Sequence, residues 1–211
     1  MKLGDEIISA FKDFRTFTFN DIRILLSEKN KDISDKTIQV TISRMVKKHT
    51  IYRIVKGVFS LQRRDEFAGF AFTPFYYGGL AALMIRDLID DQVRMEVMTT
   101  RPVKRSFLGI YGGSIRIVLH HIPRKYYFGF EDVKYGNIIV PVSDPEKTLI
   151  DLFYYKRRMS VQDYAELLKR IKPRKLRGYL KAYDGHTKAT VLNFVKKHKR
   201  VADLGELDNP Y

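Results

Sequence analysis

The residues best suited to chemistry in this sequence form one face of a predicted helix near the N-terminus. In a helical projection of residues 35–48, one narrow stripe is apolar and consists of Ile38, Ile42, Met45 and Val46. The opposite side is mostly polar and cationic and consists of Lys36, Val40, Ser43 and Lys47, flanked by Gln39 and Arg44. Glutamine and serine can reach base edges, and lysine and arginine can contact phosphates or guanine. This face therefore predicts docking in the major groove of DNA.

The elements that position this face are predicted to be three helices and a hairpin within residues 1–62. The helices are expected at residues 4–14, 21–28 and 35–48, with Asn20 and Ser34 as the N-caps of the second and third. Two β-prone runs, 51–54 and 58–61, flank Val55-Lys56-Gly57, which is typical of a hairpin with glycine in the tight turn. This order is that of a winged helix-turn-helix.

The predicted hairpin adds two cations to the candidate DNA-binding surface. Lys56 at its tip and Arg53 beside it are suited to contact the DNA backbone or minor groove. The alternatives are an ordinary solvated helix face or a three-helix module that binds acidic protein partners. The chain as a whole carries a net charge of +15, and an excess of this size usually faces polyanions. Element order, face composition and net charge agree, so DNA binding is favoured.

The remainder of the chain, residues 63–211, is predicted to be a second domain, with the charged segment 62–66 as a linker. Its strands are expected at 94–100, 114–120, 126–130 and 138–142, and its helices at 79–89, 144–157, 160–171, 173–183 and 187–199. Ser160, Pro173 and Thr187 are predicted to open the last three helices. The expected fold class is α+β: an N-terminal winged helix-turn-helix, then a mixed domain with a small sheet and a helical C-terminal part.

The segment Val142–Leu152, VSDPEKTLIDL, together with Gly57–Leu61, GVFSL, carries a family resemblance. With these motifs the sequence resembles the AbiEi-type antitoxins of type IV toxin–antitoxin systems. The resemblance implies an N-terminal domain that binds inverted repeats in its own promoter and represses the operon. It also implies that the C-terminal domain counteracts a nucleotidyltransferase-like toxin without needing a stable complex.

The same segment has a plain structural explanation as the start of a helix. Asp144 is suited to be the N-cap, Pro145 fits the first helical position, and Glu146 complements the helix dipole. Asp151 follows Lys147 by one turn, which predicts a surface ion pair worth only a few tenths of a kcal/mol. A well-capped structural helix is favoured over a catalytic site here.

The helical C-terminal end concentrates the positive charge of the chain. From Lys169 to Arg200, twelve residues are basic and only one, Asp184, is acidic. Leu176, Leu192 and Val195 are expected to pack inside, which directs the charges outward. We expect a polyanion-binding surface for flanking DNA or for RNA, formed by Lys172, Arg174, Lys175, Arg177, Lys196 and Lys197.

Several classes of chemistry lack the residues they need. The chain has no cysteine, which excludes disulfides, thiol nucleophiles and thiolate zinc sites. His120 and His121 are adjacent in a predicted strand and would point to opposite faces. No Walker A run and no H-E-x-x-H motif occurs. We therefore expect no metal, no cofactor and no catalysis.

The alternative is a nucleic-acid-processing enzyme, a nuclease or nucleotide-handling activity targeted by the winged helix. Asp132-Val133-Lys134 is the only acidic-x-Lys triplet, and no aspartate lies between Asp91 and Asp132 to act as its upstream partner. Cleavage of phosphodiesters that requires both Mg²⁺ and Asp132 would favour this alternative.

Location and assembly follow from two further patterns. Phe67–Ile85 is uncharged over 19 residues, but Pro74 and Gly78-Gly79 interrupt it, so a strand or loop followed by a buried helix is favoured over a membrane span. Without signal-peptide features at the N-terminus, we expect a cytoplasmic protein. A lone winged helix buries little DNA surface, so we expect a monomer or weak dimer that binds double-stranded inverted repeats cooperatively.

Overall fold

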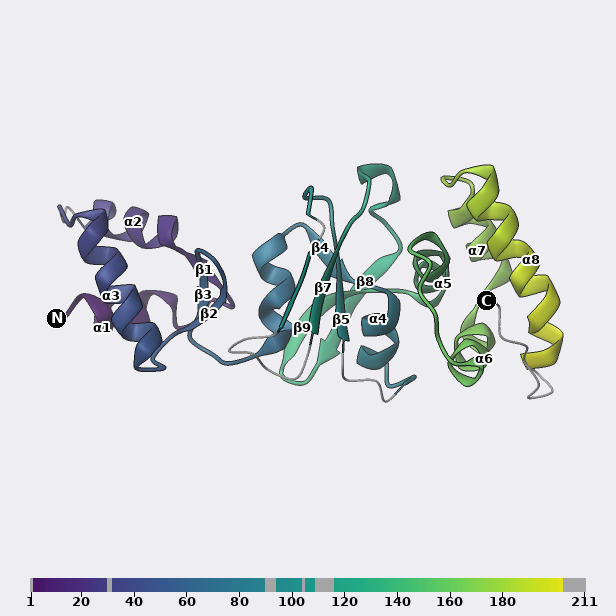
Figure 1. The fold of residues 1–211 in the computed structure, drawn as a ribbon, viewed down its shortest axis with the longest axis horizontal. Coiled ribbons are helices and arrows are strands. Elements are labelled where there is room, and N and C mark those ends of the chain that lie inside the picture. Colours follow the sequence, from purple (N-terminus) through teal and green to yellow (C-terminus); the bar gives the residue numbers. More distant parts are fainter. Residues whose placement is uncertain (1, 30–31, 90–93, 104, 109–115, 203–211) are drawn as a thin grey trace. The chain divides into compact units, whose positions relative to one another are not determined.

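The computed structural model describes residues 2–29, 32–89, 94–103, 105–108 and 116–202, and its fold is α+β (Figure 1). The chain divides into two compact units. The first is built on Met1–Thr73, and the second on Pro74–Ser106 and the chain from Arg116 onward. The first unit thus includes a 3₁₀ helix, η1 (Asp65–Phe72), that follows the boundary expected at residue 62.

The first unit has the predicted order of helix, helix, turn, helix and hairpin. Its helices are α1 (Leu3–Phe11), α2 (Phe19–Glu28) and α3 (Asp35–Lys47), and its hairpin strands are β2 (Tyr52–Val55) and β3 (Val58–Ser60). A short strand that the sequence pattern missed, β1 (Phe17–Thr18), pairs antiparallel with β3. The resulting sheet has the order β1-β3-β2.

Two turns of this unit show how the local sequence fixes the elements. The N-cap of α2 is Thr18 and not Asn20, because the Thr18 side chain accepts the Asp21 N–H while Asp21 bonds back to the Thr18 N–H. Ser34 caps α3 as expected. Gly57 in the hairpin has φ +84°, a conformation that favours glycine.

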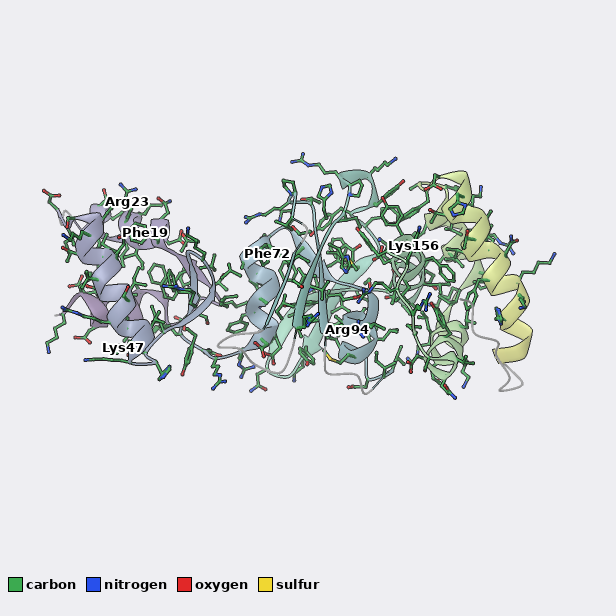
Figure 2. The ribbon with its side chains drawn as sticks, viewed as in Figure 1. Phe19, Arg23, Lys47, Phe72, Arg94 and Lys156 are labelled. Atoms are coloured by element: carbon green, nitrogen blue, oxygen red, sulfur yellow. The ribbon has the colours of Figure 1, made fainter. Side chains whose placement is uncertain are left out.

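Apolar residues of α1, α2, α3 and the small sheet, with Ile51, form the core of the first unit. These residues are Ile7, Phe11, Phe17, Ile22, Leu26, Ile38, Ile42, Met45, Ile51 and Phe59. In η1, Phe67 and Phe72 are buried, and the Arg15 guanidinium lies 4.7 Å from the centre of the Phe70 ring. Phe72 is labelled in Figure 2. The expected linker, residues 62–66, therefore runs into a packed 3₁₀ helix.

The second unit contains a mixed sheet with the strand order β6-β7-β5-β4-β9-β8. Its strands are β4 (Phe75–Tyr77), β5 (Arg94–Thr99), β6 (Arg105–Leu108), β7 (Arg116–His121), β8 (Phe130–Tyr135) and β9 (Ile138–Ser143). β5 runs parallel to β7, and β4 runs parallel to β9. β4–β5 and β8–β9 are antiparallel pairs.

One of the predicted strands is wrong. Residues 126–130 do not form a strand, because Tyr126 ends the 3₁₀ helix η2 (Arg124–Tyr126) and stacks on Tyr183 at 4.1 Å. β8 begins only at Phe130.

The uncharged stretch, residues 67–85, forms most of η1, then β4 and the buried helix α4 (Gly79–Ile85). Within the described chain, no helix combines the length and hydropathy that crossing a membrane requires.

Four helices follow the sheet, and the first of them is central. α5 (Pro145–Tyr154) contacts α4 as well as α6 (Val161–Arg170), α7 (Pro173–Leu180) and α8 (Gly185–Ala202). Asp144 and Ser160 cap α5 and α6 as expected. α8 begins before Thr187, because the carboxylate of Asp184 accepts the Thr187 N–H at 2.8 Å.

Candidate nucleic-acid interface

The structure separates the two faces of α3 as the sequence predicted. Ile38, Ile42 and Met45 are buried in the core of the first unit, and Val46, which was also expected inside, is partly buried against it. All six candidate residues of the opposite face are exposed: Lys36, Gln39, Val40, Ser43, Arg44 and Lys47. Val40 keeps 41% of its surface exposed, so this face of α3 also presents one apolar side chain. Figure 2 labels Lys47, the last residue of α3.

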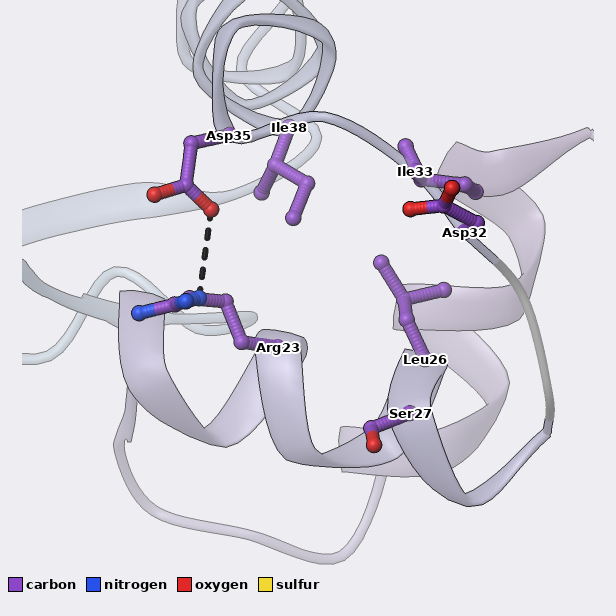
Figure 3. A pocket seen from close by; sticks show the side chains of 7 residues that line it. All are labelled: Arg23, Leu26, Ser27, Asp32, Ile33, Asp35 and Ile38. Carbon is purple, nitrogen blue, oxygen red and sulfur yellow. Dashed lines mark ion pairs between the residues drawn. The ribbon is translucent and has the colours of Figure 1, made fainter.

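The start of α3 is held against α2 across the turn between them. Arg23 Nε lies 3.1 Å from Asp35 Oδ1, beside a hollow of about 420 Å³ (Figure 3). Both side chains are more than half exposed, so this ion pair contributes at most about 1 kcal/mol. The burial of Leu26 on α2 and Ile38 on α3 therefore contributes more than the ion pair to holding α3 in place.

The hairpin presents the two other predicted cations. Arg53 and Lys56 are both exposed, on β2 and in the turn that follows it. The Arg53 guanidinium lies 5.8 Å from the centre of the buried Phe59 ring, which limits its range of positions. The first unit therefore offers an exposed helix face and an exposed hairpin that carry Lys, Arg, Gln and Ser.

The candidate basic residues of the helical end are exposed, and one of them is bound to two carboxylates of the protein. Lys172, Arg174, Arg177, Lys196 and Lys197 are exposed on or beside α7 and α8. Lys175 differs, because its Nζ lies 3.0 Å from Asp144 Oδ2 and 3.4 Å from Glu146 Oε2. Desolvation alone would lower the pKa of Lys175, but these two carboxylates raise it. The charge of Lys175 is therefore balanced within the protein.

The expected surface pair of Lys147 and Asp151 is wrong, because both side chains are fully buried within α5. Their ion pair is joined by Tyr76, whose hydroxyl donates to Asp151 Oδ2 at 2.9 Å. The Lys147 ammonium also lies 5.2 Å from the centre of the Tyr76 ring. Burial lowers the pKa of Lys147 and raises that of Asp151, although each partner opposes the shift of the other.

Asp144 and Glu146 tie α5 to α7. Asp144 caps α5 through Oδ1 and accepts the Tyr179 hydroxyl through Oδ2 at 2.8 Å. Glu146 Oε1 accepts the Lys172 N–H at 2.7 Å, just before α7 begins. The segment Val142–Leu152 therefore organises the interior of the second unit. The sequence predicted the N-cap at Asp144 but not the burial of this segment, because the strands and helices that cover it are distant in sequence.

A second buried acid, Glu96 on β5, was not singled out by the sequence. Its Oε2 accepts the Leu80 N–H at 3.1 Å, and its Oε1 lies 2.6 Å from Arg157 Nε and 3.7 Å from His120 Nε2. Burial alone would raise the pKa of Glu96, but His120, Arg157 and the Leu80 N–H together lower it. Glu96 thus joins the sheet to the first turn of α4.

The residues of the enzyme alternative are not assembled into a site in the described part of the chain. Asp132 and Lys134 are exposed on β8. Among the described residues, no group of three or more His, Asp or Glu side chains could hold a metal ion. His120 and His121 are both partly buried, and His120 belongs to the Glu96 cluster.

Comparisons with known proteins show a likeness of fold. No family model matches the sequence, and no curated protein matches it. The crystal structure of the Rv2827c protein from Mycobacterium tuberculosis is similar, with a TM-score of 0.61 at 12% sequence identity. The match covers 93% of this chain and 77% of that chain. The likeness therefore spans both units.

Proposed function

We propose that the protein binds double-stranded DNA through the first unit, a winged helix-turn-helix, and represses transcription. α3 is then the recognition helix in the major groove, and the β2–β3 hairpin is the wing. The observation that carries this proposal is the exposed face of α3, where Lys36, Gln39, Val40, Ser43, Arg44 and Lys47 all face away from the core. An exposed valine among them is suited to contact a thymine methyl group.

The proposed role in the cell is that of an antitoxin which represses its own operon. The support is the resemblance of Val142–Leu152 and Gly57–Leu61 to AbiEi-type antitoxins. The DNA target would be inverted repeats in the promoter. The partner would be a nucleotidyltransferase-like toxin, opposed without a stable complex.

The DNA-binding proposal is tested on the promoter of the protein's own gene. Fluorescence anisotropy would compare the unaltered chain with a variant that combines Lys36→Ala, Gln39→Ala, Arg44→Ala and Lys47→Ala. We expect the variant to lose specific binding, because it removes both base-reading and phosphate-contacting groups. A control that removes two cations elsewhere replaces the exposed Lys12 and Lys134 with alanine.

The outcome separates the alternatives. If the folded α3 variant binds the promoter like the unaltered chain, the recognition-helix assignment is wrong.

The antitoxin role has its own test, which is growth of cells that express the neighbouring toxin gene with and without this chain. Rescue of growth by a variant of α3 that no longer binds DNA would assign that role to the second unit.

A further inference from the structure

The helical end of the second unit contains an apolar groove that the basic sequence pattern did not indicate. Leu192 and Val195 on α8 were expected to be inside, but both are only partly buried. With Leu176 and Pro173 of α7 they line a groove of about 400 Å³. A groove of this size is in the range of about 300–1,000 Å³ typical of ligand sites.

The groove exists because α7 and α8 both pack on α5 and much less on each other. Leu176 is fully buried between them and forms the floor, while Leu192 and Val195 line the α8 side. α7 is short, and it ends at Leu180, so it cannot cover the longer α8. Leu192 and Val195 pack partly against the core of the second unit and leave the rest of their surface in one hollow, which a partner could cover.

Cations border the groove on both sides. Arg177 of α7 and Lys196 of α8 are part of its lining and are exposed. Arg177 is shared with an adjoining hollow of about 780 Å³, which is also lined by Arg174 and Lys181. In the described part of the chain these four side chains form no ion pair, whereas the neighbouring Lys175 is paired with Asp144.

In the part of the chain that the structure describes, no acidic residue lines the groove. Asp184, the only acid between Lys169 and Arg200, is used to cap α8 through the N–H and hydroxyl of Thr187. An aliphatic floor with a purely cationic border therefore requires an occupant that is apolar at its centre and acidic at its edges.

We propose that the α7–α8 groove docks an acidic amphipathic helix of a partner protein. Leucine-like side chains spaced three and four residues apart would fill the hollow between Leu176 and Leu192, and flanking carboxylates would meet Arg177 and Lys196. A nucleic acid fits less well. Single-stranded nucleic acids stack successive bases on aromatic side chains, and the lining of the groove has no aromatic ring. This inference does not rest on the proposed DNA binding.

The test is to select binders from a display library of random 16-residue peptides on the full-length chain. We expect enriched peptides with apolar residues at helical spacing and acidic residues between them. Binding of a synthetic enriched peptide should weaken at least tenfold in Arg177→Glu, in Lys196→Glu and in Leu192→Gln. Lys134→Glu, an exposed lysine on β8, is the matched control and should bind like the unaltered chain.

Three results would overturn the proposal. The first is the absence of enriched acidic peptides. The second is binding that Arg177→Glu weakens but the apolar-floor variant Leu192→Gln leaves unchanged, which indicates charge alone. The third is a 15-nucleotide single-stranded RNA that binds more tightly than any selected peptide and displaces it. Since Arg177 and Lys196 are exposed, their variants retain the fold and give an answer even if Leu192→Gln unfolds.

Discussion

The ammonium group of Lys147 and the carboxylate of Asp151 form an ion pair one helical turn apart with no access to solvent. The sequence presents this pair as a routine surface contact. In the structure, α5 packs against α4, α6, α7 and α8, so the polar side of α5 is shielded from solvent. Tyr76 on β4 supplies the further hydrogen bond that a buried carboxylate needs.

This geometry predicts strongly non-additive effects of substitution. Lys147→Met should lower the free energy of unfolding by about 3–5 kcal/mol, because it leaves Asp151 buried without its cation. The double variant Lys147→Met with Asp151→Leu should recover much of that loss. Urea unfolding followed by circular dichroism measures both. An exposed pair of similar spacing, Lys169 with Glu166, is the control, and Lys169→Met should change stability by less than about 0.5 kcal/mol.

A double variant as unstable as Lys147→Met would contradict this explanation. It would mean that the Lys147 alkyl chain, or the space it fills among Tyr76, Phe128 and Tyr183, matters more than charge balance.

The helices were predictable from sequence because their signals are local. Ser34, Asp144 and Ser160 each accept a backbone N–H within the next three residues, so the caps are visible in the sequence itself. The exposed face of α3 was predictable for a similar reason, since helical periodicity alone separates it from Ile38 and Ile42.

The interior of the second unit was not predictable, because it depends on contacts that are distant in sequence. Tyr76 and Asp151 are 75 residues apart, and Arg86 donates to the Ser143 carbonyl 57 residues away. Short strands such as β1 and β4 carry too few residues for an alternating pattern. Residues 126–130 are rich in aromatic residues that favour strands, yet Tyr126 ends η2, and the rings of this segment pack in or against the core.

Stability at acidic pH should depend on Glu96. Its pKa is lower in the folded chain than the ordinary value of 4.5, so its contribution to stability is present above pH 4.5 and is lost as the pH falls through the folded value. The free energy of unfolding of Glu96→Gln should therefore fall less steeply below pH 4.5 than that of the unaltered chain. Glu131→Gln, in an exposed ion pair with Arg86, is the control. Parallel curves for Glu96→Gln and the unaltered chain would rule out this role.

Two glycines should respond in opposite directions to alanine. Gly79 has φ +55°, and a Cβ there would lie 1.9 Å from Glu96 Oε2, so Gly79→Ala should cost at least about 2 kcal/mol. Gly178 lies within α7, and a Cβ there meets nothing within 4 Å. Gly178→Ala should stabilise the chain by about 0.5–1 kcal/mol. Thermal unfolding measures both, and a neutral Gly79→Ala would show that Glu96 does not hold the start of α4.

If the first unit binds DNA as proposed, residues that read bases and residues that contact phosphates should respond differently to salt concentration. Gln39→Ala and Ser43→Ala should relax sequence preference, because these side chains are suited to base edges. Lys47→Ala and Lys56→Ala should weaken binding to all sequences and reduce the slope of log K against log salt by about 0.9 each. Anisotropy titrations at several salt concentrations distinguish the two classes. An unchanged slope in both lysine variants would place the phosphate contacts elsewhere.

Cooperative binding to two half-sites should compensate for the small DNA contact of one winged helix. A single small module buries about 600–1,000 Å² on DNA, and specific affinity usually needs more. Because two copies on an inverted repeat are related by a dyad, each brings the same surface to the other. We expect the chain to be a monomer or weak dimer in sedimentation. It should bind a promoter with two half-sites more tightly than independent binding to each half-site predicts.

Half-site spacing gives this prediction its control. Inserting five base pairs between the half-sites rotates one by about half a helical turn, which moves the second copy to the other side of the duplex. Contact between neighbouring copies is then lost, while each half-site keeps its own contacts to α3. We therefore expect the insertion to abolish cooperativity and to leave single-site affinity unchanged. Cooperativity that survives the insertion would indicate DNA bending rather than contact between copies, and no cooperativity on the natural spacing would refute the model.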